Sequence, residues 1–167
     1  VIGYAIPKPR IGVMLEVPSM VFMLPQLANR VDFISVGTND LTQYILAVDR
    51  NNTRVASIYD SLHPAMLRAL AMIAREAEQH GLDLRLCGEM AGDSMCVAIL
   101  IGRGFSLLSM NGRSVARVKY LLRHIEIEDA QELAARSLEA QLATEVRHQV
   151  AAFMERRGMG GLIRGGR

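Results

Sequence analysis

The stretch DFISVGTNDLTQYILAVDR, residues 32–50, decides how this chain is interpreted. Its apolar run, Phe33 to Val36, is short, rich in strand-forming residues and closed by Gly37. This is the pattern of a strand buried on both faces within a parallel sheet. The polar residues that follow, among them Asn39 and Asp40, are predicted to form a loop at the carboxyl end of that strand. Because parallel α/β sheets collect ligands at that end, we expect the functional site there.

Length and composition exclude several classes of protein. A chain of 167 residues that is 50% hydrophobic and 22% charged predicts one domain with a sizeable core. The 19 basic and 17 acidic residues are interleaved, so nothing suggests a nucleic-acid partner, and no apolar run approaches the roughly 18 residues that span a membrane. Two cysteines, Cys87 and Cys96, are too few for a disulfide scaffold and favour a reducing compartment. We therefore expect a soluble, cytoplasmic protein, and the first residue, Val1, favours a fragment of a longer one.

Strand-like and helix-like segments alternate along the chain. Besides the strand at 33–36, strands are predicted at 11–17, 84–87 and 105–110, and helices at 19–30, 64–80, 94–101, 114–123, 129–138 and 142–156. Residues 51–62 are predicted to form a long surface connection, and the glycine-rich tail at 158–167 is predicted to be disordered. The order implies right-handed crossovers and a parallel α/β sheet. Four strands cannot close a barrel, so the residues leave two alternatives: a small open sheet or half of a (βα)8 barrel.

Two carboxylates are expected at neighbouring strand ends. Glu16 closes the strand at 11–17, and Asp40 lies one βα unit further along the chain. Two carboxylates so near to each other repel unless a ligand binds to them. A pair of carboxylates suits Mg2+, which keeps its other coordination positions for water and substrate oxygens. The alternative is that Asp40 caps a helix and Glu16 is a surface residue.

Cys87 and Arg50 are further candidates near the same edge. The Cys87 thiol, beside Gly88 at the end of the third strand, can serve as acid, base or nucleophile, or can simply pack, as we expect of Cys96. Arg50 can reach an anionic substrate or pair with Asp49. The histidines show no metal-binding spacing and are interpreted as structural: His63, His80, His124 and His148.

Three segments resemble the C-terminal phosphoenolpyruvate-binding barrel of Enzyme I, the phosphoenolpyruvate-protein phosphotransferase of the sugar phosphotransferase system. They are GVMLEVPS (12–19), DFISVGTNDLTQYILAVDRNN (32–52) and LCGEMAGD (86–93). The similarity looks collinear from residue 11 to residue 153. It implies the second half of a (βα)8 TIM-type barrel over residues 1–125, with extra C-terminal helices over 126–157.

The resemblance also implies roles for individual residues. Glu16 and Asp40 are expected to bind Mg2+, and Asn39 and Arg50 to contact the phosphate of phosphoenolpyruvate. Cys87 is expected to protonate the enolate, and Gly88 to let backbone N–H groups approach the substrate. The phosphoryl group would pass to a histidine on a separate domain and then to a phosphocarrier protein, with release of pyruvate.

Other interpretations remain open at this point. Pyruvate phosphate dikinases and phosphoenolpyruvate synthases share the GTNDLTQ and CGE elements, and a non-catalytic half-barrel module is a third alternative. The segment LLSMNGRSVARVK, residues 107–119, departs from the FSMSA-type ending usual in the sugar-system enzyme, and we prefer the nitrogen-related Enzyme I. A half-barrel would leave two strand edges unpaired and an inner face formed by Val13, Leu15, Ile34 and Val36. We therefore expect a homodimer.

Overall fold

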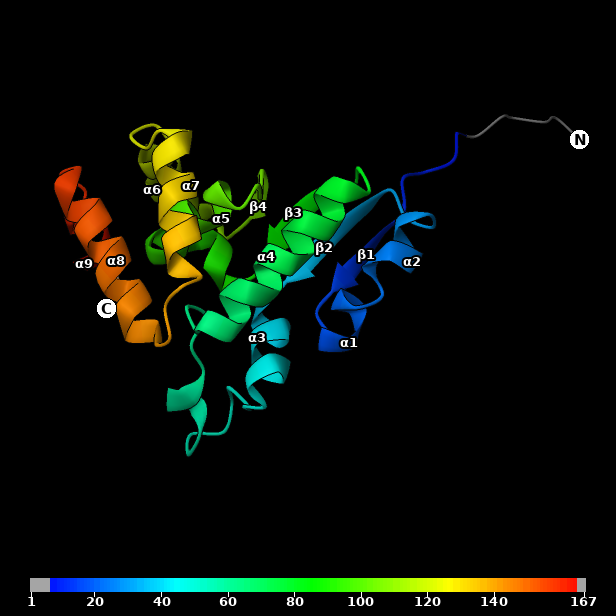
Figure 1. Ribbon diagram of the computed structural model, residues 1–167, viewed down its shortest axis with the longest axis horizontal. Helices are drawn as coiled ribbons and strands as arrows, with labels where there is room; N and C mark the ends of the chain where they lie inside the picture. Colours follow the sequence, from blue (N-terminus) through cyan, green and yellow to red (C-terminus); the bar gives the residue numbers. More distant parts are fainter. Residues whose placement is uncertain (1–6, 165–167) are drawn as a thin grey trace, which may run out of the picture.

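A parallel sheet of four strands forms the centre of the molecule, and its spatial order, β1-β2-β3-β4, is also the order of the strands in the chain. The strands are β1 (Gly12–Leu15), β2 (Phe33–Gly37), β3 (Asp83–Cys87) and β4 (Leu107–Ser109). All three pairings are parallel, and helical segments connect consecutive strands, as Figure 1 shows. The predicted α/β class with parallel strands is therefore confirmed.

Helices connect the strands and continue beyond the last of them. The computed structural model describes residues 7–164, so the expectations for residues 1–6 and 165–167 lie outside the described residues. The α-helices within that range are α1 (Pro18–Val21), α2 (Leu24–Ala28), α3 (Thr38–Leu46), α4 (Pro64–Gln79), α5 (Ser94–Gly102), α6 (Gly112–Leu122), α7 (Ile127–Ser137), α8 (Ala143–Arg156) and α9 (Gly161–Arg164). Two 3-10 turns accompany them, η1 (Ala56–Ile58) and η2 (Glu89–Gly92). No helix in the described part of the chain has the length and hydropathy needed to cross a bilayer.

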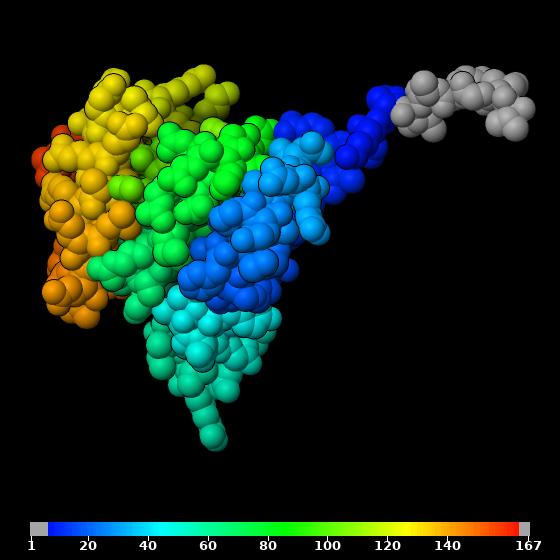
Figure 2. Space-filling model, turned by 45° about the vertical axis from the view of Figure 1, so that its right-hand side comes forward, coloured from blue at the N-terminus to red at the C-terminus, as the bar shows by residue number. Residues whose placement is uncertain are grey.

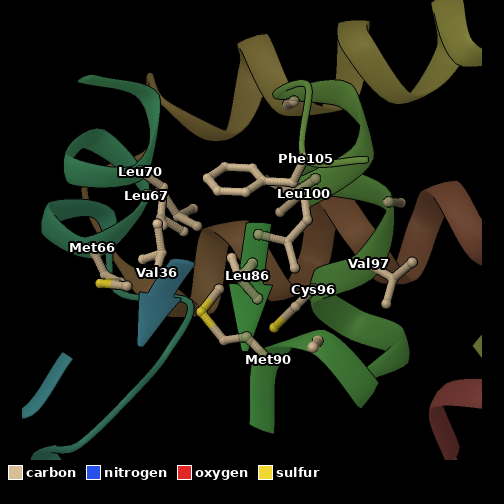
Figure 3. Packing of buried hydrophobic residues seen from close by; sticks show 14 of the residues in the cluster. Val36, Met66, Leu67, Leu70, Leu86, Met90, Cys96, Val97, Leu100 and Phe105 are labelled. Atoms are coloured by element: carbon tan, nitrogen blue, oxygen red, sulfur yellow. The ribbon is translucent and has the colours of Figure 1, made fainter. Parts of the chain in front are cut away.

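One face of the sheet carries the hydrophobic core. Successive residues of a strand point to opposite faces, and the alternate residues on this face are buried: Leu15, Ile34, Val36, Leu84 and Leu86. Figure 3 shows Leu86 between Leu67 and Leu70 of α4 on one side and Leu100 of α5 on the other. Burying a leucine side chain stabilises a fold by roughly 1.5–3 kcal/mol, so this layer fixes the positions of the strand ends.

The opposite face of the sheet is largely open. Met14 and Leu107 are 46% and 50% exposed, and Phe33 and Ser35 are only half-buried. The strand at 33–36 is therefore not buried on both faces, contrary to expectation. We also expected an open inner face formed by Val13, Leu15, Ile34 and Val36, and that prediction is wrong. They pack towards the helices, because the side-chain alternation directs these aliphatic residues to the covered side.

The helix predicted at 19–30 is two short helices, α1 and α2. Pro18 and Pro25 lie in their first turns. Proline has no N–H group to donate within a helix, so it suits a first turn and interrupts a longer helix. The N-cap of α1 is Val17.

The polar segment after β2 is a helix and not the expected loop. Helix α3 begins at Thr38 directly after the strand, so Asn39 and Asp40 lie in its first turn. A carboxylate in that position is favoured by the positive end of the helix dipole. The helix ends where Ala47 adopts a left-handed conformation with φ 53°, and the connection from there to α4 contains η1.

Side-chain caps begin the two helices that follow β3 and β4. Asp93 caps α5, since its Oδ1 accepts a hydrogen bond from the Met95 N–H at 2.9 Å. Asn111 is the cap of α6. The Asn111 Oδ1 accepts from the Ser114 N–H at 3.0 Å.

The C-terminal segment is more ordered than expected. Met159 is buried, and helix α9 follows directly, with Leu162 packed against the core. The prediction of a disordered tail is therefore wrong for residues 158–164. The apolar residues Met159 and Leu162, set among the glycines, provide the contacts that hold this segment in place.

Candidate functional site

The predicted site residues meet at one edge of the sheet. The parallel register places Leu15 beside Val36 and Gly37 beside Cys87, so the carboxyl ends of β1, β2 and β3 lie level with one another. Residues that come directly after a strand, or in the first turn of the helix after it, therefore share this edge. They are Glu16, Asn39, Asp40 and Gly88.

Glu16 lies against the end of the neighbouring strand. A Cβ atom placed on Gly37 would lie 2.9 Å from the Glu16 Oε2 and 3.0 Å from the Glu16 Cβ. Any side chain at position 37 would therefore displace the carboxylate. Glycine at the end of β2 thus gives the half-buried Glu16 a place beside the start of α3.

Asp40 pairs with Arg50 across the α3 connection. The Arg50 Nη2 lies 3.6 Å from the Asp40 Oδ1, and both side chains are partly exposed. The Arg50 backbone N–H also donates to the Gln43 Oε1 at 3.2 Å. The alternative pairing with Asp49 is wrong, because the Asp49 Oδ1 instead accepts from the Asn51 N–H in a local turn.

Glu16 and Asp40, the two carboxylates predicted to hold a divalent cation, both lie at this edge. Among the described residues, no three His, Cys, Asp or Glu side chains form a metal-binding group. Mg2+ is commonly held by one or two protein carboxylates, with phosphate oxygens and water in its other positions. The Glu16 carboxylate, seated over Gly37 in space that a Cβ would fill, fits an ion that a phosphorylated ligand helps to coordinate.

Cys87 presents a free, half-buried thiol at the end of β3. Its Sγ lies 3.5 Å from both the Met14 Sδ and the Val36 carbonyl oxygen, and the Ser35 hydroxyl donates towards it at 3.7 Å. Its backbone carbonyl accepts from the buried Thr38 Oγ1 at 2.9 Å. These contacts hold the thiol on the open face of the sheet, where it can exchange a proton with a ligand.

The start of α3 is joined to the turn after Cys87. The Asn39 Oδ1 accepts from the Glu89 N–H at 3.0 Å, so only the Asn39 amide N–H groups remain to donate to a ligand. Gly88 has a φ of 106°, and a Cβ there would clash with the Thr38 hydroxyl. Glycine is therefore required at position 88 for the approach of the two segments, a role that the sequence did not reveal.

Tyr59 is a site residue that the sequence interpretation missed. Its hydroxyl donates to the Asn39 backbone carbonyl at 3.3 Å. Burial raises the pKa of the Tyr59 phenol, although the Thr42 hydroxyl and the Arg50 guanidinium nearby favour its ionised form. The one signal available was its place in the long connection at 51–62, since long loops in compact domains are often functional.

Cys96 and two of the histidines have structural roles, as expected. Cys96 is fully buried in the core, and that burial raises the pKa of its thiol well above its usual value. His63 caps α4 through its Nδ1, which accepts from the Ala65 N–H. His124 stacks on Tyr120 within the first residues after α6.

The family of the chain follows from comparison with known proteins. A family model described as "PEP-utilising enzyme, PEP-binding domain", where PEP is phosphoenolpyruvate, matches residues 2–127. The chain belongs to this family. Every site residue described above lies within the matched part of the PEP-binding domain.

Several curated proteins are similar to this PEP-binding domain. The "Phosphoenolpyruvate-dependent phosphotransferase system" protein of Salmonella typhimurium (strain LT2) is 90% identical over 165 residues, which cover 99% of this chain and 22% of that protein. The "Phosphoenolpyruvate-protein phosphotransferase" of Borreliella burgdorferi is 41% identical over 135 residues, 81% of this chain and 24% of that protein. The "Multiphosphoryl transfer protein 1" of Escherichia coli (strain K12) is 40% identical over 143 residues, 86% of this chain and 17% of that protein. The chain thus spans about a quarter or less of the length of these relatives.

Proposed function

We propose that this chain is the part of a phosphoenolpyruvate-protein phosphotransferase that holds the metal, the phosphate-binding groups and the proton donor. The observation that carries the proposal is the junction of the Cys87 turn with the start of α3, which brings the thiol, Asn39 and Asp40 to one edge. A relative 41% identical to this chain bears that name. The chain would form the second half of a (βα)8 TIM-type barrel over residues 1–125, followed by helices over 126–157.

The phosphate of phosphoenolpyruvate would bind between Asn39 and Arg50. The Asn39 amide and the Arg50 guanidinium donate hydrogen bonds to its oxygens, and a guanidinium suits a phosphate particularly well. Glu16 and Asp40 would hold Mg2+, which supplies positive charge opposite the phosphoryl group and the enolate. Gly88, with no side chain, would let the substrate approach the backbone of this turn, in which the Glu89 N–H is already bonded to Asn39.

Cys87 would be the proton donor of the reaction. When the bond between the phosphoryl group and the enol oxygen breaks, enolpyruvate remains, and its methylene carbon must gain a proton to become pyruvate. The Cys87 thiol gives up that proton and recovers one from solvent at the open face. The contacts with Met14 and Val36 hold the sulfur in place for this transfer.

The phosphoryl group would pass to a histidine on a separate domain and from there to a phosphocarrier protein. We favour the nitrogen-related branch of the phosphotransferase system, because residues 107–119 depart from the sequence pattern of the sugar-system enzyme. The names of the relatives favour this proposal over a pyruvate phosphate dikinase, a phosphoenolpyruvate synthase or a non-catalytic module. Two free cysteines and no disulfide fit a cytoplasmic protein.

The metal-binding pair provides the test. In a full-length protein that carries this segment, Glu16→Gln and Asp40→Asn are each expected to lower Mg2+-dependent release of pyruvate from phosphoenolpyruvate by on the order of 100-fold or more, since several kcal/mol of charge stabilisation are lost. Asp49→Asn is the matched control. It keeps the oxygen that accepts from Asn51 and is expected to leave the rate unchanged.

Two results would count against the proposal. If the unmodified protein releases no pyruvate, the reaction itself is wrong. If both variants keep the rate and Mg2+ dependence of the unmodified protein, the reaction stands but Glu16 and Asp40 do not hold its metal.

A further inference from the structure

Three consecutive residues tie the connection between α3 and α4 to three different helices. Tyr59 hydrogen-bonds to α3, Asp60 pairs with α8, and the Ser61 hydroxyl lies 3.9 Å from a sulfur of α5. The part of the connection before them projects from the body of the molecule as a tip, drawn in teal in Figure 2. This exposed part begins with residue 49 and includes Arg50, so the arginine expected to meet the substrate depends on how the connection is anchored.

The Tyr59 phenol lies among groups of the candidate site. Its proton is donated to the Asn39 carbonyl oxygen. The Arg50 guanidinium lies close enough to favour ionisation of the phenol, but burial outweighs this and raises the pKa of Tyr59. The phenol therefore keeps its proton for the hydrogen bond to the Asn39 carbonyl.

Arg50 has few other restraints. Its backbone is held by Gln43, and its guanidinium reaches Asp40 at 3.6 Å, which is longer than a close ion pair. An exposed pair at that distance stabilises an orientation only weakly. The half-buried Tyr59, bonded to Asn39 next to Asp40, gives the connection that carries Arg50 a second point of attachment to α3.

We propose that Tyr59 is a positioning residue, which fastens the connection to α3 and holds the Arg50 guanidinium over Asp40, ready for an oxyanion of the substrate. The inference rests on the proposed function, because it takes Arg50 as a phosphate-binding group. Tyr59 takes no direct part in the chemistry. Its loss is expected to weaken substrate binding more than it slows turnover.

The first test measures kinetics in a full-length protein that carries this segment. Tyr59→Phe is expected to raise the KM for phosphoenolpyruvate about tenfold, the effect of losing one hydrogen bond, and to change kcat less than about threefold. Tyr44→Phe is the matched control, because Tyr44 lies on α3 and is 53% exposed. It is expected to change neither constant.

A double variant shows whether Tyr59 acts through Arg50. In an Arg50→Ala background, Tyr59→Phe is expected to raise KM by less than about twofold, because the side chain that it positions is gone. An equal effect of Tyr59→Phe with and without Arg50 would overturn the proposal, and so would an unchanged KM in the single variant.

A second measurement does not need activity and separates this inference from the proposed function. Hydrogen–deuterium exchange of the 167-residue chain is expected to be faster at residues 48–58 in Tyr59→Phe than in Tyr44→Phe. If the full-length protein proves inactive but this difference appears, the anchoring role stands and the phosphate role of Arg50 is wrong. Equal exchange in both variants overturns the anchoring role.

Discussion

Contacts with neighbouring residues hold Cys87 in place. Its carbonyl is held by Thr38, and its sulfur touches a thioether on one side and a backbone carbonyl on the other. A proton donor that is held in advance loses little conformational freedom when the substrate binds, which lowers the barrier to transfer. The surroundings of Cys87 therefore suit general acid catalysis better than a mobile surface thiol would.

Replacing the thiol is expected to separate the two halves of the proposed reaction. In a full-length protein, Cys87→Ala is expected to slow pyruvate formation by about 10²–10⁴-fold, while phosphoryl exchange with phosphoenolpyruvate continues. Cys96→Ser is the control, since Cys96 lies in the core away from the site edge. Pyruvate formation at the unmodified rate by Cys87→Ala would show that another group delivers the proton.

Sequence reasoning found the residues whose positions follow from strand ends alone. Glu16, Asp40 and Cys87 each come at or just after an apolar run, and parallel pairing puts such residues at one edge. Thr38 and Tyr59 were missed because their roles are contacts between segments 49 and 20 residues apart. No local pattern encodes a hydroxyl that reaches a distant backbone carbonyl.

Helices α5 and α7 are in unusually close contact. A Cβ on Gly102, the last residue of α5, would collide with the backbone carbonyl of Ala130 in α7. Backbone atoms cannot turn aside as a flexible side chain can, so the two helices would have to separate. Glycine at this position thus sets the distance at which the C-terminal helices dock on the sheet domain.

A methyl group at this contact is expected to destabilise the chain. Gly102→Ala is expected to lower the free energy of unfolding by about 1–3 kcal/mol, the usual cost of overpacking, in urea-induced unfolding. Gly112→Ala is the control. That glycine begins α6 with no atom within 4 Å of its Cβ position, so alanine there is expected to be neutral or to stabilise by up to about 1 kcal/mol. Equal effects of the two substitutions would show that α5 and α7 can move apart freely.

At the level of elements, most of the fold was predictable and the errors have physical causes. Helix α4 follows from Pro64 and a regular apolar stripe, and it appears as expected. The error at 19–30 came from continuing a helical pattern through Pro25. The error at 38–46 came from interpreting a polar segment as a loop. Burial of Leu41 and the helix dipole acting on the first turn instead favour α3.

At the scale of the whole molecule, residues 7–164 leave one sheet face and two strand edges uncovered. On the edge strands β1 and β4, Met14 and Leu107 are about half exposed. Phe22, directly after α1, and Val115 on α6 add exposed apolar surface. Unpaired edges with apolar neighbours favour association with another strand. We therefore expect the isolated 167-residue chain to self-associate, and to lack phosphotransferase activity without the acceptor histidine.

Sedimentation velocity at increasing protein concentration measures this association. Leu107→Lys, which places a charge on the β4 edge, is expected to shift the chain towards the monomer. Leu142→Lys is the control, because Leu142 is 60% exposed at the start of α8, beyond the sheet. A purely monomeric unmodified chain would refute the prediction, and pyruvate release by the purified chain would refute its second part.

Because β1, β2, β3 and β4 stand side by side in the order in which they are translated, each new βα unit meets a finished neighbour as it leaves the ribosome. Among residues 7–164, no strand must wait for a later segment to be inserted between two earlier ones. The nascent chain can therefore gain structure one unit at a time, and the newest strand always provides one of the two open edges of the growing sheet. A pause in translation after any unit would leave that edge as the place where a chaperone binds or a second nascent chain misassembles.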